Sequence, residues 1–117
     1  MLRIRKEQWD ILVRTQVREF DDWMHDHVRA QIPTVYEAFG EERVRELIRH
    51  GRERAGKYGV TGRREVCKYI DLMFVLGKDF DVDLPWAAEI LRKPRDPVAK
   101  IHFLYRAAKK RHNAHQL

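Results

Sequence analysis

The residues best suited to chemistry or recognition are three aspartates that alternate with apolar residues in the segment KDFDVDLPW. Asp79, Asp81 and Asp83 resemble the start of a calcium-binding loop, in which alternating oxygen ligands surround a hard cation. The sixth position of such a loop is leucine here rather than glycine, and the twelfth is isoleucine rather than glutamate. The pattern therefore favours a helix-capping loop that pairs with nearby arginines over a metal site.

The same segment has the composition of a binding edge. Phe80, Val82 and Leu84 occupy the alternate positions, where they can anchor the loop on the core while the carboxylates face outward. Trp86 follows Pro85 at an expected helix start, so its ring should be partly exposed. We therefore predict a protein-binding surface that includes Asp79, Phe80, Asp81, Asp83 and Trp86.

Asp71 interrupts the most apolar run of the chain, residues 66–76. A carboxylate on such a helix needs a fixed partner, which could be Lys68 one turn earlier or an arginine of another helix. The alternative is that Asp71 contacts a binding partner, and we include it among the candidate partner-binding residues.

Cys67 is the single cysteine, so no disulfide forms within the chain, and its apolar surroundings favour a reduced core residue over a catalytic thiol.

The histidines do not form a recognisable metal-binding or catalytic pattern. His25 and His27 are two residues apart on an expected helix and therefore point in different directions, while His112 and His115 fall in a tail expected to fray. We interpret all six as surface residues: His25, His27, His50, His102, His112 and His115. The sequence also lacks a glycine-rich phosphate loop, a nucleophile elbow and paired catalytic glutamates. It predicts a protein without enzymatic activity, cofactor or metal.

Basic residues form a second candidate surface. Arg45, Arg49 and Arg52 follow helical spacing on one face, although Glu46 and Glu53 lie at pairing distance and neutralise part of it. The last helix is also strongly basic, with Lys100, Arg106, Lys109, Lys110 and Arg111. Nucleic-acid binding is therefore an alternative function, but no recognition signature accompanies the charge, so such binding should be weak and salt-dependent.

The formal net charge of +6 conceals a segmented distribution. Residues 1–42 carry −3, residues 43–68 carry +6, residues 69–91 carry −4 and residues 92–117 carry +7. This alternation is typical both of pairing between neighbouring helices and of a surface that attracts an acidic partner.

The length of 117 residues suits one domain with a core that needs no disulfide or metal. The N-terminal MLRIRKEQWD becomes charged within six residues, and no segment approaches the ~20 apolar residues that span a bilayer. We therefore expect a cytoplasmic protein that does not enter a membrane, and either a monomer or a homodimer.

Apolar residues recur every three or four positions, which predicts an all-α, single-domain bundle of about five helices over residues 1–117. Pro33, Gly59, Gly77 and Pro94 should separate the helices. The expected helices are residues 6–31, 41–58, 62–76, 85–91 and 97–111, with a short turn at 34–39 and a frayed tail at 112–117. Asp96 should cap the last of them.

The expected core centres on the apolar helix at 62–76. Val66, Ile70, Met73 and Phe74 should be buried by the first two helices, and Gly51 with Ala55 should permit a close helix approach. Trp9 and Trp23 are expected in the core as part of the apolar face of a long N-terminal helix. The last helix should face inward with Val98, Ile101, Leu104, Tyr105 and Ala108.

Three segments, IRKEQWD, YGVTGRREVCKYIDLMFVLGKDFD and LPWAAEIL, together resemble a family of small uncharacterised helical proteins associated with bacterial type VI secretion and its PAAR, VgrG and effector gene clusters. The resemblance covers residues 4–91, and the basic segment after Leu91 matches less well. It implies an accessory role, as an adaptor or chaperone that holds a secreted effector or spike component before loading. The alternatives are a basic nucleic-acid-binding or regulatory module and an immunity protein that occludes a toxin.

Overall fold

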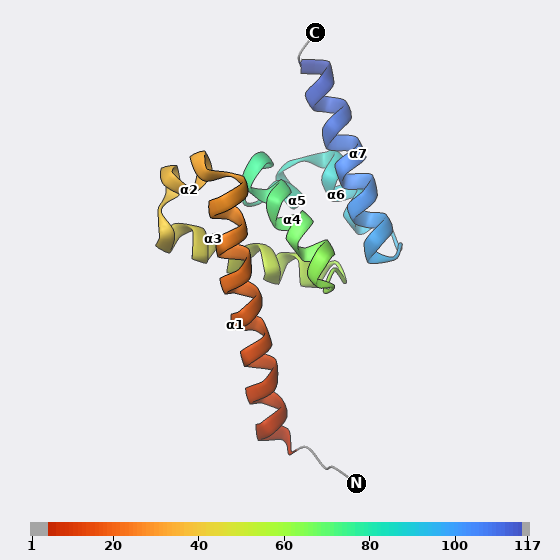
Figure 1. Ribbon diagram of the computed structural model, residues 1–117. Helices are drawn as coiled ribbons and strands as arrows, with labels where there is room; N and C mark the ends of the chain where they lie inside the picture. Colours follow the sequence, from red (N-terminus) through yellow and green to blue (C-terminus); the bar gives the residue numbers. More distant parts are fainter. Residues whose placement is uncertain (1–4, 116–117) are drawn as a thin grey trace. The chain divides into compact units, whose positions relative to one another are not determined.

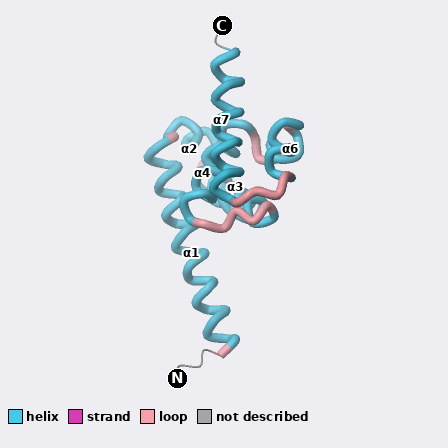
Figure 2. The backbone as a smooth tube through the Cα atoms, turned by 90° about the vertical axis from the view of Figure 1, so that its right-hand side faces the viewer, coloured by secondary structure: helices cyan, strands magenta, loops and turns pink. Residues whose placement is uncertain are grey.

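The computed structural model describes residues 5–115 of the backbone, and the side chains of residues 5–112. Within this range all regular structure is helical, with seven helices and no strand (Figures 1 and 2). The helices are α1 (Lys6–Gln31), α2 (Pro33–Phe39), α3 (Glu41–Lys57), α4 (Arg63–Leu76), α5 (Phe80–Asp83), α6 (Pro85–Arg92) and α7 (Pro97–His115). The all-α class is as predicted, and the short helices α2 and α5 bring the number to seven instead of five.

The chain forms two compact units that divide between Ile48 and Arg49, inside α3. The first contains α1, α2 and the start of α3, and the second contains the end of α3 and α4 to α7. Among the described residues, no helix combines the length and apolar composition needed to cross a membrane.

Proline and glycine end the helices of the first unit at the expected places. α1 ends at Gln31, and the next residue, Ile32, has φ −132° and ψ 63°, because Pro33 disfavours helical geometry in the residue before it. Pro33 then occupies the first turn of α2, where its missing N–H costs nothing. α2 ends at Phe39 and is followed by Gly40, whose φ of 82° lies in the left-handed region that favours glycine.

α4 carries much of the apolar core of the second unit. Val66, Ile70 and Met73 are buried, whereas Phe74 is only half-buried, contrary to the prediction. α3 approaches α4 closely at Gly51, where a Cβ atom would lie 2.9 Å from Ile70 Cγ1 and 3.0 Å from Met73 Sδ. The expected role of Gly51 in close helix packing is therefore confirmed.

α6 and α7 pack against each other, and α7 also packs against α4. The expected N-cap of α7 is present, because the Ala99 N–H donates to Asp96 Oδ1 at 3.0 Å. Ile101 and Leu104 are buried, but Val98 and Tyr105 are exposed, so the predicted inward face is too wide. The Tyr105 hydroxyl instead donates to the Lys68 carbonyl at 2.9 Å, which leaves the ring at the surface.

Candidate functional site

Asp81 is the residue whose position differs most from the predicted acidic edge. Its side chain is 0% exposed, and its Oδ2 accepts hydrogen bonds from Arg54 Nη2 at 2.6 Å, from Arg54 Nε at 2.7 Å and from the Tyr58 hydroxyl at 2.6 Å. The prediction failed because residues 80–83 form a helical turn instead of an extended loop. Phe80 and Asp81 are therefore both buried while Val82 is exposed, so the expected alternation is absent.

The environment of Asp81 explains two pKa shifts. Burial raises the pKa of Tyr58 to about 12, and the hydrogen bond to Asp81 adds to the effect because it favours the neutral phenol. Burial acts to lower the pKa of Arg54, but its hydrogen bond and attraction to Asp81 outweigh this, and the pKa is raised. Asp81, Arg54 and Tyr58 thus form a structural link between α3 and α5, and we call them the Asp81 clasp.

The remaining residues of the predicted edge are more accessible. Asp83 is exposed. Asp79 is half-buried, with its Oδ1 3.2 Å from His50 Nε2, which also contacts the Lys78 carbonyl at 3.0 Å. His50, which was predicted to be a surface residue, is half-buried and contacts the segment before α5. Trp86 is half-buried, as predicted.

Asp71 is half-buried on α4 and lies beside Cys67, whose Sγ donates to Asp71 Oδ2 at 4.0 Å. Burial, together with the negative charge of Asp71, raises the pKa of Cys67 to about 11. The thiol is therefore protonated near neutral pH. The expected pairing of Asp71 with Lys68, and its contact with a partner, stay predictions.

The predicted basic face is partly neutralised. Arg45 Nη1 lies 2.8 Å from Asp22 Oδ1 and Arg45 Nε lies 3.5 Å from Glu41 Oε1. The hydrogen bond to Asp22 is the main cause of a raised pKa for Arg45. Arg49 is exposed and Arg52 is half-buried, so the three arginines do not offer equivalent charges to a ligand.

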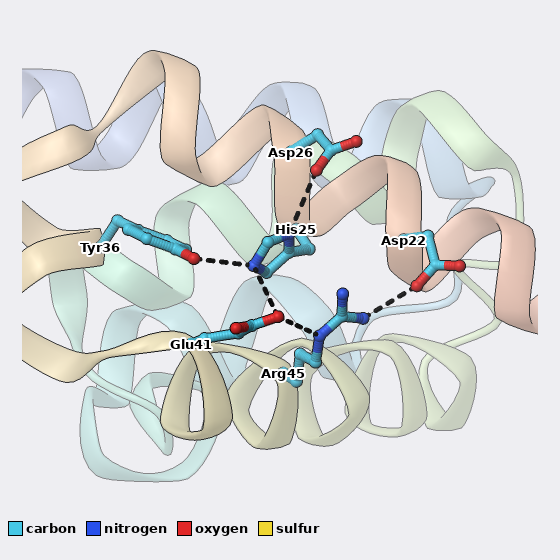
Figure 3. Close-up of polar contacts among 6 residues, drawn as sticks. All are labelled: Asp22, His25, Asp26, Tyr36, Glu41 and Arg45. Atoms are coloured by element: carbon cyan, nitrogen blue, oxygen red, sulfur yellow. Dashed lines mark hydrogen bonds and ion pairs between the residues drawn. The ribbon is translucent and has the colours of Figure 1, made fainter.

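The contacts of Arg45 belong to a polar network in the first unit, which also contains a buried histidine (Figure 3). His25 is 5% exposed, and its Nε2 is hydrogen-bonded to the Tyr36 hydroxyl at 3.0 Å and lies 3.9 Å from Glu41 Oε1. The surface assignment of His25 was therefore wrong, because residues 33–39 form a helix that places Tyr36 beside it. The His25 network consists of Asp22, His25, Asp26, Tyr36, Glu41 and Arg45.

The His25 network joins the second half of α1 to α2 and to the first turn of α3 (Figure 3). Met24 and Val28 are buried on this half of α1. Every residue from 6 to 16, in contrast, is exposed. Helix α1 is therefore fixed along its second half and leaves its first half open.

The first half of α1 exposes large apolar side chains that were expected in the core. Trp9 is 55%, Leu12 45% and Val13 38% exposed, and Trp23 further along is 40% exposed. The core assignment of both tryptophans was wrong. For Trp9 the reason is length, because a 26-residue helix spans about 39 Å whereas the seven residues of α2 span only about 10 Å.

These residues lie on one side of α1. At 100° per residue, the apolar residues of this face form a strip interrupted only by Gln16, and we call them the α1 stripe: Trp9, Leu12, Val13, Val17 and Phe20. Val17 and Phe20 are half-buried. Ile11 is more exposed than any of these, at 62%, but lies on the opposite side of the helix.

Acidic residues border the α1 stripe on both sides. The same helical geometry places Asp10 and Asp21 along one edge, where Lys6 and Arg14 also lie, and Glu19 and Asp26 along the other, which carries no basic residue. The helix as a whole carries four basic and six acidic residues. The result is an exposed apolar strip with acidic flanks. The periodicity of the strip could be predicted from the sequence, but its exposure could not.

Comparisons with protein-family models, with curated proteins and with solved structures found no match for this chain.

Proposed function

We propose that this protein is a non-enzymatic accessory factor, an adaptor or chaperone, that holds another protein by the α1 stripe. The observation that supports this is the exposure of Trp9, Leu12 and Val13 on a helix whose other half is anchored by the His25 network. Large aromatic and aliphatic side chains gathered on one exposed face mark interaction surfaces, and tryptophan is enriched among residues that dominate binding energy.

The size of the α1 stripe favours a transient contact. Covering the exposed parts of Trp9, Leu12 and Val13 would remove on the order of 300 Å² of apolar surface from water on this chain. Twice that area is smaller than a standard specific interface, so the stripe alone supports only a weak, short-lived complex. A weak, reversible contact suits a factor that must release its partner.

The shape and charge of the α1 stripe identify the kind of partner. A narrow apolar strip on a helix pairs with a similar strip on another helix, and flanking charges decide which helix is accepted. The flanking residues Asp10, Glu19, Asp21 and Asp26 favour basic flanks on the partner. A second α1 would bring acidic flanks together, so the preferred occupant is a basic amphipathic helix of a different protein.

The family resemblance suggests where such a partner occurs. In a type VI secretion system it would be a secreted effector or a spike component held in the cytoplasm before loading. Asp83, which is exposed on the second unit, would add a contact from a separate surface.

Comparative capture from the native bacterium tests this function. Three tagged baits are used: the wild type, the stripe variant Trp9→Ala/Leu12→Ala, and Ile11→Ala, which removes an exposed apolar residue outside the stripe. We expect a protein retained by the wild type and by Ile11→Ala but lost from the stripe variant, with its cross-linked segment forming a basic amphipathic helix. An identical set of retained proteins on all three baits would contradict the proposal.

A further inference from the structure

The second unit has a strongly basic hollow between α6 and α7. Its volume is about 490 Å³. It is lined by Trp86, Glu89, Ile90, Lys93, Arg95, Phe103, Arg106, Ala107, Lys110 and Arg111. Five of these residues are cationic and one is acidic. The acidic residue, Glu89, is already in an ion pair, with its Oε1 3.6 Å from Lys93 Nζ. We call this feature the α6–α7 hollow.

Two of its arginines are held against aromatic rings. The Arg111 guanidinium lies 4.4 Å from the centre of the Trp86 ring, and the Arg95 guanidinium lies 4.3 Å from the centre of the Phe103 ring. Such stacking restrains the long arginine side chains. Arg111 Nη1 also donates to the Ala107 carbonyl at 3.2 Å, which holds this guanidinium further in place and leaves its other N–H groups to an acceptor. The hollow therefore contains two flat platforms that also carry positive charge.

The other cations of the hollow are not neutralised by the described residues. Arg106 and Lys110 are both exposed, and neither forms an ion pair within the part of the chain that the structure describes. Four positive charges thus remain in excess over the carboxylate, which is the arrangement that attracts a polyanion.

We propose that the α6–α7 hollow binds single-stranded nucleic acid. Arg106 and Lys110 would contact phosphates, and an unpaired base would stack on the platform formed by Trp86 and Arg111. Positive grooves with aromatic or guanidinium planes are the usual means of binding single strands without strong sequence preference. An acidic peptide would use the charges but not the planes. This inference is independent of the α1 stripe, since the hollow lies entirely in the second unit.

The test measures fluorescence anisotropy of a labelled twelve-nucleotide oligothymidylate at 50 mM and 200 mM salt. The hollow variant is Arg106→Gln/Lys110→Gln. The matched control is Arg64→Gln/Lys68→Gln, which removes the same charge from exposed positions on α4. We expect the hollow variant to bind at least about tenfold more weakly, and its salt dependence to fall by about 1.4 in logarithmic slope, or 0.7 for each lost phosphate contact. The control should stay within about threefold of the wild type.

A second readout detects stacking itself. Replacing Trp9 and Trp23 with phenylalanine leaves Trp86 as the only tryptophan of the chain. Its fluorescence should be quenched by the oligonucleotide and should not change with a polyglutamate peptide of equal charge. Circular dichroism confirms that each variant is folded.

Four results would overturn the inference. They are an absence of binding at 50 mM salt, equal weakening by the hollow and control variants, binding of polyglutamate as tight as that of the oligonucleotide, and unchanged Trp86 fluorescence at saturation.

Discussion

Asp81 shows how a residue that looks suited to recognition can be used for folding instead. Its carboxylate is fully buried and accepts hydrogen bonds from both Arg54 and Tyr58. A buried charge is tolerated only when it is paired in this way. The Asp81 clasp therefore belongs to the scaffold that positions α5 and α6.

Replacing Asp81 with asparagine should destabilise the protein. The change leaves the partly buried Arg54 guanidinium without its counter-charge, and losing one member of a buried pair costs about 3–5 kcal/mol. Asp83→Asn, two residues away and exposed, is the control and should change stability by less than about 0.5 kcal/mol. Urea denaturation of both variants measures the difference, and equal midpoints would show that the clasp does not contribute.

Because Tyr58 belongs to the clasp, the stability of the protein should decrease at alkaline pH. Its pKa of about 12 in the folded protein exceeds the value of 10.0 for a free tyrosine, so folding favours the protonated phenol. This contribution is complete below pH 10 and is lost as the pH rises towards 12. The urea midpoint of the wild type should therefore fall between pH 9 and pH 11.5, and that of Tyr58→Phe should fall less. An equal fall in both proteins would contradict the assignment.

At the scale of elements, α3 and α4 can pack closely because Gly51 has no side chain. Gly51 lies in a helix, where glycine is unfavourable by about 1 kcal/mol relative to alanine, and it is kept there by the closeness of Ile70 and Met73. Gly56 lies five residues later in the same helix, and a Cβ atom added there would meet nothing from neighbouring elements within 4 Å. A comparison of alanine substitutions at the two glycines therefore distinguishes the effect of packing from the effect of helix propensity.

Gly51→Ala and Gly56→Ala should change stability in opposite directions. At Gly51 the added methyl group meets Ile70 Cγ1 at 2.9 Å, so overpacking should destabilise the protein by about 1–3 kcal/mol despite the better helix propensity. At Gly56 the same change should stabilise it by about 0.5–1 kcal/mol. Thermal melts of the two variants check this, and a stabilised Gly51→Ala would mean that α3 and α4 do not approach so closely.

Local signals made several elements predictable. Pro33 and Gly77 mark helix ends, and the Asp96–Pro97 pair marks a helix start, because each restricts or frees the backbone without help from distant residues. Periodicity identified the apolar side of α1 but not its exposure, because exposure depends on whether another element covers it. The helical turn of α5 was missed because four residues are too few for a period to be recognised.

At the scale of the whole chain, the segmented charge is used in two ways. Part of it is neutralised internally, as in the pairs Arg45–Asp22 and Arg54–Asp81. The excess appears on two surfaces, the acidic flanks of the α1 stripe in the first unit and the α6–α7 hollow in the second. Arg106, Lys110 and Arg111 were recognised in the sequence as part of a basic last helix, whereas Lys93 and Arg95 were not. The stacking of two arginines on Trp86 and Phe103 depends on how α6 and α7 pack.

The central claim is that the α1 stripe binds a basic amphipathic helix. Isothermal titration calorimetry tests it with two synthetic helical peptides of 21 residues, which share a leucine stripe and carry either lysine and arginine or glutamate on its flanks. The proteins compared are the wild type, Trp9→Ala/Leu12→Ala and Ile11→Ala, with circular dichroism to confirm folding.

We predict that the wild type and Ile11→Ala bind the basic peptide with the same affinity, and that Trp9→Ala/Leu12→Ala binds it at least about tenfold more weakly, a loss of about 1.4 kcal/mol or more. The acidic peptide should bind more weakly than the basic one to the wild type. Equal affinity of all three proteins for the basic peptide, or a preference of the wild type for the acidic peptide, would contradict the claim.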